Sequence, residues 1–161
     1  MKIHTSKKIS LIIVSIFCSI LFLSNTCFAR RIKTDSKFTE RQVAWGIIFC
    51  GDILSRAESP LTGDEKFMLK DYFEGTLDLS PVSEQLAENR NMDTDMARAI
   101  IVAAKITAKY ELHMLGITSI TGYLTGMNLS KAKLGITMDD TTINSDEAER
   151  ILQEAKTLFN G

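Results

Sequence analysis

Apolar residues recur along most of the chain at spacings of three and four, which is the period of an α-helix. One such stripe runs between Val43 and Ala57, a second between Phe67 and Leu77, and a last one between Ala148 and Phe159. The first stripe includes Ile47 and Ile48, and no alternating run typical of a β-strand appears. The pattern therefore predicts an all-α protein, a small irregular bundle of four to five helices.

Capping residues predict where these helices begin. Thr39 with Gln42, and Thr62 with Glu65, have the spacing of a capping box. In a capping box, the side chain of each of the two residues accepts a hydrogen bond from the main-chain N–H of the other. Three further helices are expected to begin at capping residues. These are Ser80, Asp93 and Ser145.

The segment 94–128 is the least charged part of the predicted domain, and we expect the other helices to pack around it. Small residues at helical spacing predict a face for close helix packing or for a ligand, formed by Ser119, Gly122 and Gly126. Gly116 and Gly135 are expected to end helices as left-handed residues. Whether the helix continues past Gly116 is left open by its β-branched neighbours.

The first 29 residues have the composition of a secretory signal peptide. Three lysines precede the uncharged, apolar stretch Ile9–Leu23, and Cys27 and Ala29 are small residues suited to a signal-peptidase site. Cleavage after Ala29 would make Arg30 the first residue of a periplasmic or secreted protein. An uncleaved membrane anchor is the alternative, although the apolar stretch is shorter than the roughly 20 residues of a membrane span.

The chain thus divides into a signal peptide (1–29), a basic tail (30–38) and a single helical domain (39–161). Residues 1–29 hold three of the 19 basic residues and none of the 20 acidic ones, so the remainder has a net charge of −4. That charge argues against nucleic-acid binding. The remainder also keeps only Cys50 of three cysteines, so it cannot form an internal disulfide. Cys50 lies on the first apolar stripe and is expected to be inert core.

The motifs of phosphate loops, zinc sites and serine hydrolases are missing from the sequence. His113 is the single histidine after residue 29, which makes a zinc site improbable. A calcium loop starting at Asp140 would need Gly at its sixth position and Glu at its twelfth, where Ser145 and Ile151 stand. We therefore expect neither a metal nor a cofactor.

Three classes of function remain. The first is an exported, non-catalytic interaction protein of the bacterial cell envelope, such as an inhibitor, an immunity-type protein or an accessory of a secretion apparatus. Trp45 and Phe49, one helical turn apart, would line its groove for a partner protein. The second is a periplasmic carrier of a small apolar ligand held between helices, and the third is a hydrolase that uses carboxylates such as Asp52 or Glu111. None of these is an integral membrane protein once the signal peptide has been removed.

Overall fold

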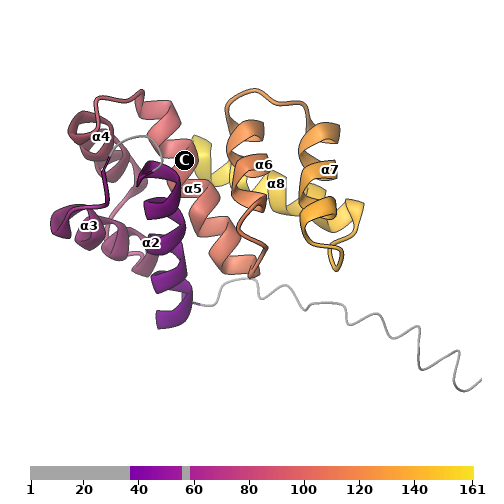
Figure 1. Cartoon of the computed structure of the whole chain (residues 1–161), viewed down its shortest axis with the longest axis horizontal. Coiled ribbons are helices and arrows are strands. Elements are labelled where there is room, and N and C mark those ends of the chain that lie inside the picture. Colours follow the sequence, from indigo (N-terminus) through magenta and orange to yellow (C-terminus); the bar gives the residue numbers. More distant parts are fainter. Residues whose placement is uncertain (1–36, 56–58) are drawn as a thin grey trace, which may run out of the picture. The chain divides into compact units, whose positions relative to one another are not determined.

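A computed structural model of the protein describes residues 37–55 and 59–161. Within these residues the chain forms seven α-helices and no strand. They are α2 (Glu40–Ser55), α3 (Gly63–Glu74), α4 (Leu79–Asn89), α5 (Thr94–Tyr110), α6 (Gly116–Leu124), α7 (Leu129–Asp139) and α8 (Ser145–Asn160) (Figure 1). The all-α prediction is confirmed, whereas four to five helices were too few. The predicted signal peptide lies outside the described residues, as does the basic tail up to residue 36.

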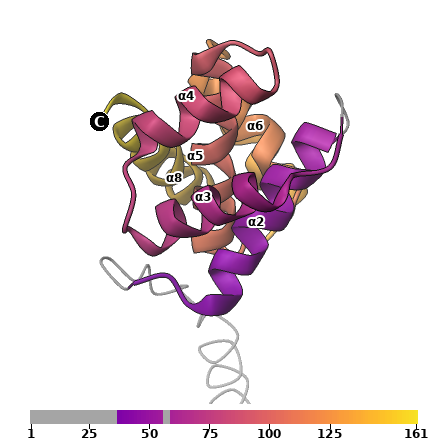
Figure 2. The same ribbon diagram turned by 90° about the vertical axis from the view of Figure 1, so that its left-hand side faces the viewer.

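Helix α5 lies at the centre of the bundle and contacts α2, α4, α6 and α8 (Figures 1 and 2). Ten of its 17 residues are buried, and five of those are alanines. Because alanine side chains are short, neighbouring helices can approach α5 from several sides at once. The expectation that the other helices pack around the weakly charged segment 94–128 is therefore confirmed for its first half.

The segment 94–128 is not one continuous helix. α5 ends at Tyr110, and Glu111 follows it in the left-handed conformation with φ 51°. The Leu112 N–H then donates to the Thr107 carbonyl over 3.0 Å, and the buried Leu112 side chain packs under the turn. Gly116 begins α6 rather than ending a helix, so the expected left-handed role at this position was wrong.

Helix α7 was not foreseen, because Gly135 was taken to mark a helix end. Gly135 instead lies in the middle of α7, where a Cβ atom would come within 2.1 Å of the Ser119 Oγ on α6. The glycine is needed because the two helices approach each other closely at this point. The left-handed glycines of the described chain are Gly75 and Gly126, with φ 82° and 116°.

Both predicted capping boxes are present. At the start of α2, the Thr39 N–H donates to Gln42 Oε1 over 3.0 Å, and the Gln42 N–H donates to Thr39 Oγ1 over 3.2 Å. At the start of α3, the Thr62 N–H donates to Glu65 Oε2 over 2.8 Å, and the Glu65 N–H returns to Thr62 Oγ1 over 3.3 Å. Asp93 also caps α5 as expected, by accepting from the Met96 N–H.

Two predicted N-caps are displaced by one or two residues. α4 begins with Asp78 as its N-cap, and Ser80 lies inside the helix, where its carbonyl accepts from the Ser83 hydroxyl. α8 is capped by Asn144 rather than by Ser145, because the Asn144 Oδ1 accepts from two main-chain N–H groups of the first turn. Asn144 thus takes the capping role expected of Ser145, whereas Asp78 holds the N-cap position of α4 without a side-chain capping hydrogen bond.

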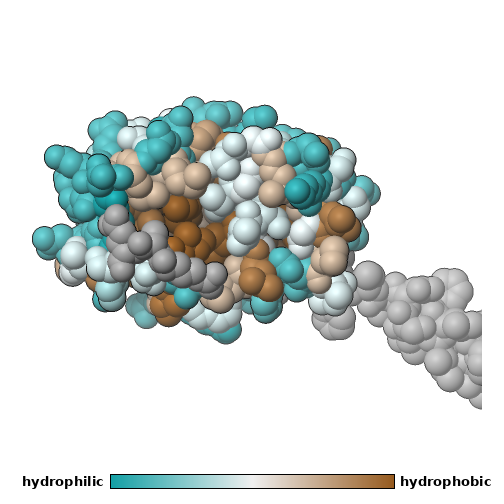
Figure 3. Space-filling view, turned by 45° about the horizontal axis from the view of Figure 1, so that its top comes forward, coloured by the Kyte–Doolittle hydropathy of each residue, from teal (hydrophilic) through white to brown (hydrophobic). Residues whose placement is uncertain are grey.

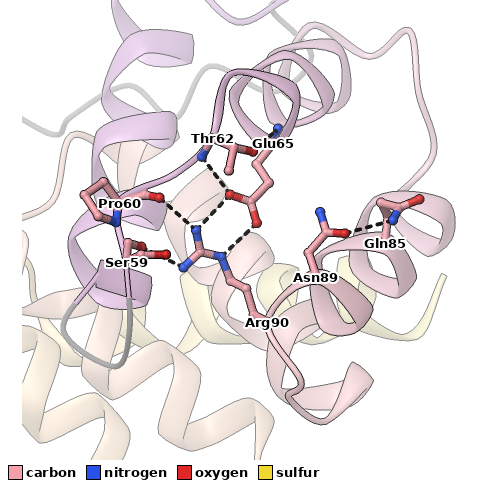
Figure 4. A network of polar contacts seen from close by, with 7 residues as sticks. All are labelled: Ser59, Pro60, Thr62, Glu65, Gln85, Asn89 and Arg90. Carbon is pink, nitrogen blue, oxygen red and sulfur yellow. Dashed lines mark hydrogen bonds and ion pairs between the residues drawn. The ribbon is translucent and has the colours of Figure 1, made fainter.

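A buried ion pair joins Glu65 of α3 and Arg90, which follows α4 (Figure 4). Arg90 Nη1 donates to the Ser59 carbonyl over 2.9 Å, and Nη2, which also pairs with Glu65, donates to the Pro60 carbonyl over 3.3 Å. Arg90 therefore joins α3, α4 and the segment that leads into α3.

Candidate protein-binding face of α2

Helix α2 packs on α5 and α3 through one side only. Its buried residues follow each other at helical spacing: Val43, Gly46, Cys50 and Leu54. Gly46 is required here because a Cβ atom would meet the Phe73 ring at 2.8 Å. Cys50 has no exposed surface, as expected for a core residue, and burial raises the pKa of its thiol to about 12.

The opposite side of α2 carries a second stripe, which we call the α2 face. It consists of Arg41, Ala44, Trp45, Ile48, Phe49 and Asp52. Ile48 is 60% exposed, although the periodicity had placed it on the buried stripe. Trp45 and Phe49 are each half-buried, so part of each ring remains open to solvent. The α2 face is therefore apolar in its middle, where Ile48 is open to solvent and Phe49 also packs against the core.

The aromatic residues of the α2 face are held in place. The Trp45 and Phe49 rings lie 6.1 Å apart, tilted by 54°, which is within the range of favourable aromatic pairs. The Arg41 guanidinium carbon lies 4.4 Å from the centroid of the Trp45 ring, as in a cation–π contact. A ring fixed in this way loses little conformational entropy when a partner covers it. Trp45 is thus prepared for contact before any partner arrives.

Charge is distributed unevenly along the α2 face. Arg41 lies at its N-terminal end and Asp52 near its C-terminal end, with the apolar residues between them. Such an arrangement gives a docking surface a direction, because a partner must offer the opposite charges in the matching order.

Other exposed apolar residues include Phe67 on α3 and Leu134 and Met138 on α7, with exposed fractions of 68%, 58% and 70%. Met96, Met114 and Leu115 are exposed to a lesser degree. Phe67 had been expected on the buried side of its helix. Figure 3 shows one side of the molecule, where hydrophobic residues gather toward the middle and hydrophilic ones mostly toward the edges. What distinguishes the α2 face is that an exposed aliphatic side chain adjoins an ordered aromatic pair.

The predicted ligand face is not one surface. Ser119 of α6 faces Gly135 of α7. A Cβ atom on Gly122 would meet Met127 Cε at 2.6 Å, so Gly122 accommodates the turn that follows its own helix. Gly126 lies beyond the end of α6 in the left-handed conformation. The three residues therefore serve separate roles in the turn and in helix packing.

Gly126 does line a groove, at the point where the first turn of α5 meets the ends of α6 and α8. The groove has a volume of about 570 Å³. Its apolar lining includes Met96, Leu124 and Phe159, and Asp93 and Asp95 supply acidic groups. Of the three residues of the predicted small-residue face, only Gly126 lines this groove.

The candidate catalytic carboxylates lie apart from this groove. Asp52 belongs to the α2 face, and Glu111 is the exposed C-cap of α5. His113 is exposed, and its Nδ1 accepts from the Leu115 N–H over 3.4 Å. None of the three lines this groove.

In the acidic linker before α8, the side chains of Asp140 and Asn144 accept hydrogen bonds from main-chain N–H groups. Asp140 Oδ1 accepts from the Thr142 N–H over 3.0 Å, and Asn144 caps α8. Within residues 37–55 and 59–161, no group of three or more His, Cys, Asp or Glu residues could hold a metal ion. No helix in this part of the chain is long and apolar enough to cross a membrane.

The half-buried basic group of Lys105 was also not found by sequence reasoning. Lys105 Nζ lies 3.9 Å from the centroid of the Tyr72 ring and 5.5 Å from that of Phe38, and it donates to the Tyr72 carbonyl. Burial, with a smaller contribution from the charge of Lys109, lowers the pKa of Lys105 to about 8. The sequence signal that could have revealed it is a lysine in the middle of an apolar segment. Its contacts tie α5 to the end of α3, which is a structural role.

Compared with family models, curated proteins and solved structures, the chain gives no match. Its function is therefore argued from its own residues.

Proposed function

We propose that the protein is an exported, non-catalytic interaction protein of the bacterial cell envelope and that it binds another protein through the α2 face. The export part of the proposal rests on the composition of residues 1–29. The binding part rests on one observation. The 60% exposed Ile48 adjoins a tryptophan that is already fixed between Phe49 and Arg41.

Burial of this cluster would supply binding energy. Fully burying an isoleucine side chain contributes roughly 1.5–3 kcal/mol, and most of the Ile48 side chain is still available for burial. Tryptophan and arginine are the residues most enriched among those that dominate binding energy at interfaces. The cluster therefore has the composition of an interface centre, with charged residues at its ends as a polar rim.

Affinity capture with matched variants tests this proposal. The tagged full-length protein is produced in its own host and isolated from envelope extracts as wild type, Ile48→Asp and Phe67→Asp. Phe67 is the control because it is exposed and apolar but lies on α3. We expect Ile48→Asp to lose a protein that wild type and Phe67→Asp both retain. Equal capture by all three proteins would contradict the α2 face as the binding site.

A second candidate function is the carriage of a small apolar ligand, and the groove of about 570 Å³ at Gly126 favours it. Leu124 and Phe159 would contact the ligand. Native mass spectrometry of protein purified from its own host tests this candidate. A bound small molecule that is lost in Leu124→Asp would support it, and an empty spectrum of the wild type would count against it.

A further inference from the structure

We propose that the partner of the α2 face is a second copy of this chain, with the two α2 helices packed antiparallel about a two-fold axis. This inference rests on the proposed function, since it names the protein that the face binds. It follows from the order of residues on the face and from the charges at its ends.

The α2 face is complementary to the same face of a second, antiparallel copy. Arg41, Trp45, Ile48 and Asp52 are spaced by four, three and four residues, so all four lie along one line of the helix surface. The spacing reads the same in both directions and is centred between residues 46 and 47. Ala44 and Phe49 are centred on the same point. The residues thus form three pairs about this point: Arg41 with Asp52, Trp45 with Ile48, and Ala44 with Phe49. A two-fold axis through the point would place each residue opposite its pair mate in the second copy.

These pairs match chemically. Trp45 would face Ile48 of the second copy, which places an aromatic ring against the most exposed aliphatic side chain of the helix. Phe49 would face Ala44, so a large side chain meets a small one, as required for close packing. A two-fold interface repeats every contact, so each pair occurs twice.

The charges favour the same arrangement. Arg41 at one end of the face would meet Asp52 of the second copy, and Asp52 would meet Arg41. In a parallel arrangement Arg41 would meet Arg41 and Asp52 would meet Asp52, which is repulsive. A guanidinium can keep one plane on the Trp45 ring while its edge donates to a carboxylate. A carboxylate accepts several hydrogen bonds, so Asp52 can accept from Arg41 in addition to contacts within its own chain.

The α2 face is available for such a contact. α2 touches α5 and α3, and in two perpendicular views no other helix covers its outer side (Figures 1 and 2). Its 16 residues make a helix about 24 Å long, so a single pair of helices gives an interface at the small end of the stable range. We therefore expect a dimer that forms and dissociates with protein concentration.

Charge reversal with recombination tests the inference. Arg41→Glu and Asp52→Arg each replace both end contacts by like charges, and we expect self-association about tenfold weaker for each variant alone. An equimolar mixture of the two variants restores opposite charges at both ends. Sedimentation velocity over a range of concentrations should therefore show dimers in the mixture and in the wild type, but monomers for each variant at the same concentration.

Controls separate an interface effect from misfolding. Ile48→Asp should abolish the dimer, Phe67→Asp should leave it unchanged, and circular dichroism should show the helix content of wild type in all variants. A wild type that stays monomeric at every concentration would overturn the inference, as would a mixture that stays monomeric. If the wild type is monomeric but Ile48→Asp still loses an envelope protein in affinity capture, the proposed function stands and only the identity of the partner is wrong.

Discussion

The guanidinium of Arg90 and the carboxylate of Glu65 form two parallel hydrogen bonds, with Nε–Oε1 at 2.9 Å and Nη2–Oε2 at 2.8 Å. The two side chains are only 6% and 2% exposed. Replacing Arg90 by methionine leaves the Glu65 charge buried without compensation. We expect the free energy of unfolding to fall by about 3–5 kcal/mol, measured by urea denaturation. Lys70→Met, which breaks the exposed pair with Glu74, should cost less than about 1 kcal/mol. Equal losses in the two variants would contradict this account of the ion pair.

The same pair makes stability depend on acidic pH. Burial alone would raise the pKa of Glu65, but hydrogen bonds from Arg90 and Thr62, together with the Arg90 charge, lower it below its ordinary value. The folded protein therefore binds this proton less readily than the unfolded chain. The stabilising contribution is present above the unfolded carboxyl pKa and is lost as pH falls through the folded one. The stability difference between wild type and Glu65→Gln should be largest near neutral pH and narrow toward acid. A difference that is constant with pH would argue against this linkage.

The contact between α6 and α7 predicts the effect of a single methyl group. A Cβ atom at Gly135 would lie 2.1 Å from Ser119 Oγ and 3.1 Å from its Cβ. Gly135→Ala should therefore destabilise the protein by about 1–3 kcal/mol, despite the better helix propensity of alanine. Adding Ser119→Gly should recover part of this loss, and thermal unfolding measures both. Gly63→Ala is the control, because no atom lies within 4 Å of its Cβ position. Lack of recovery in the double variant would show that the clash lies elsewhere.

Local sequence patterns predicted the helices that begin at Thr39, Thr62 and Asp93, because capping boxes and N-caps depend on residues three positions apart. The division of residues 111–139 could not be predicted in this way. Gly135 is set by its contact with Ser119, which lies 16 residues earlier in the chain and on another helix. The Arg90–Glu65 pair likewise joins residues 25 positions apart. Contacts of this kind leave no periodic trace in the sequence.

The candidate site was predicted in part. The spacing of Trp45 and Phe49 placed them together on one side of a helix, and the structure shows their rings in contact. Ile48 was expected in the core because it follows Ile47 on the apolar stripe. Its exposure depends on which side of α2 faces the other helices, and on that side Gly46 lies close to the Phe73 ring of α3. A periodic pattern shows that a helix has an apolar face, but it does not show whether a residue at the edge of that face is buried or exposed.

The buried thiol of Cys50 should resist alkylation. The residue has no exposed surface, and burial raises its pKa to about 12, so the reactive thiolate is scarce at pH 8. Iodoacetamide should leave Cys50 unmodified in the native protein and label it fully in guanidinium chloride, as read by peptide mass mapping. Rapid labelling without denaturant would contradict the position of Cys50 in the core.

The proposed export makes a prediction about the first residue. Ala29 is expected to precede the cleavage point, so N-terminal sequencing of the protein from its own host should begin at Arg30. An Ala29→Asp variant, in which a charge replaces the small residue, should be cleaved more slowly and accumulate as the longer form. A mature protein that retains Met1 would contradict a cleaved signal peptide.

The central claim is that the α2 face binds a protein in the cell. Photo-crosslinking tests it most directly, with a photoreactive phenylalanine analogue placed at position 48 or position 67 of the full-length protein in its own host. The account predicts a discrete crosslinked product from position 48, with the mass of a dimer if the partner is a second copy. Position 67 should give no such product, and Trp45→Ala should weaken the one from position 48. Identical crosslinking patterns from positions 48 and 67, or none from position 48, would contradict the claim.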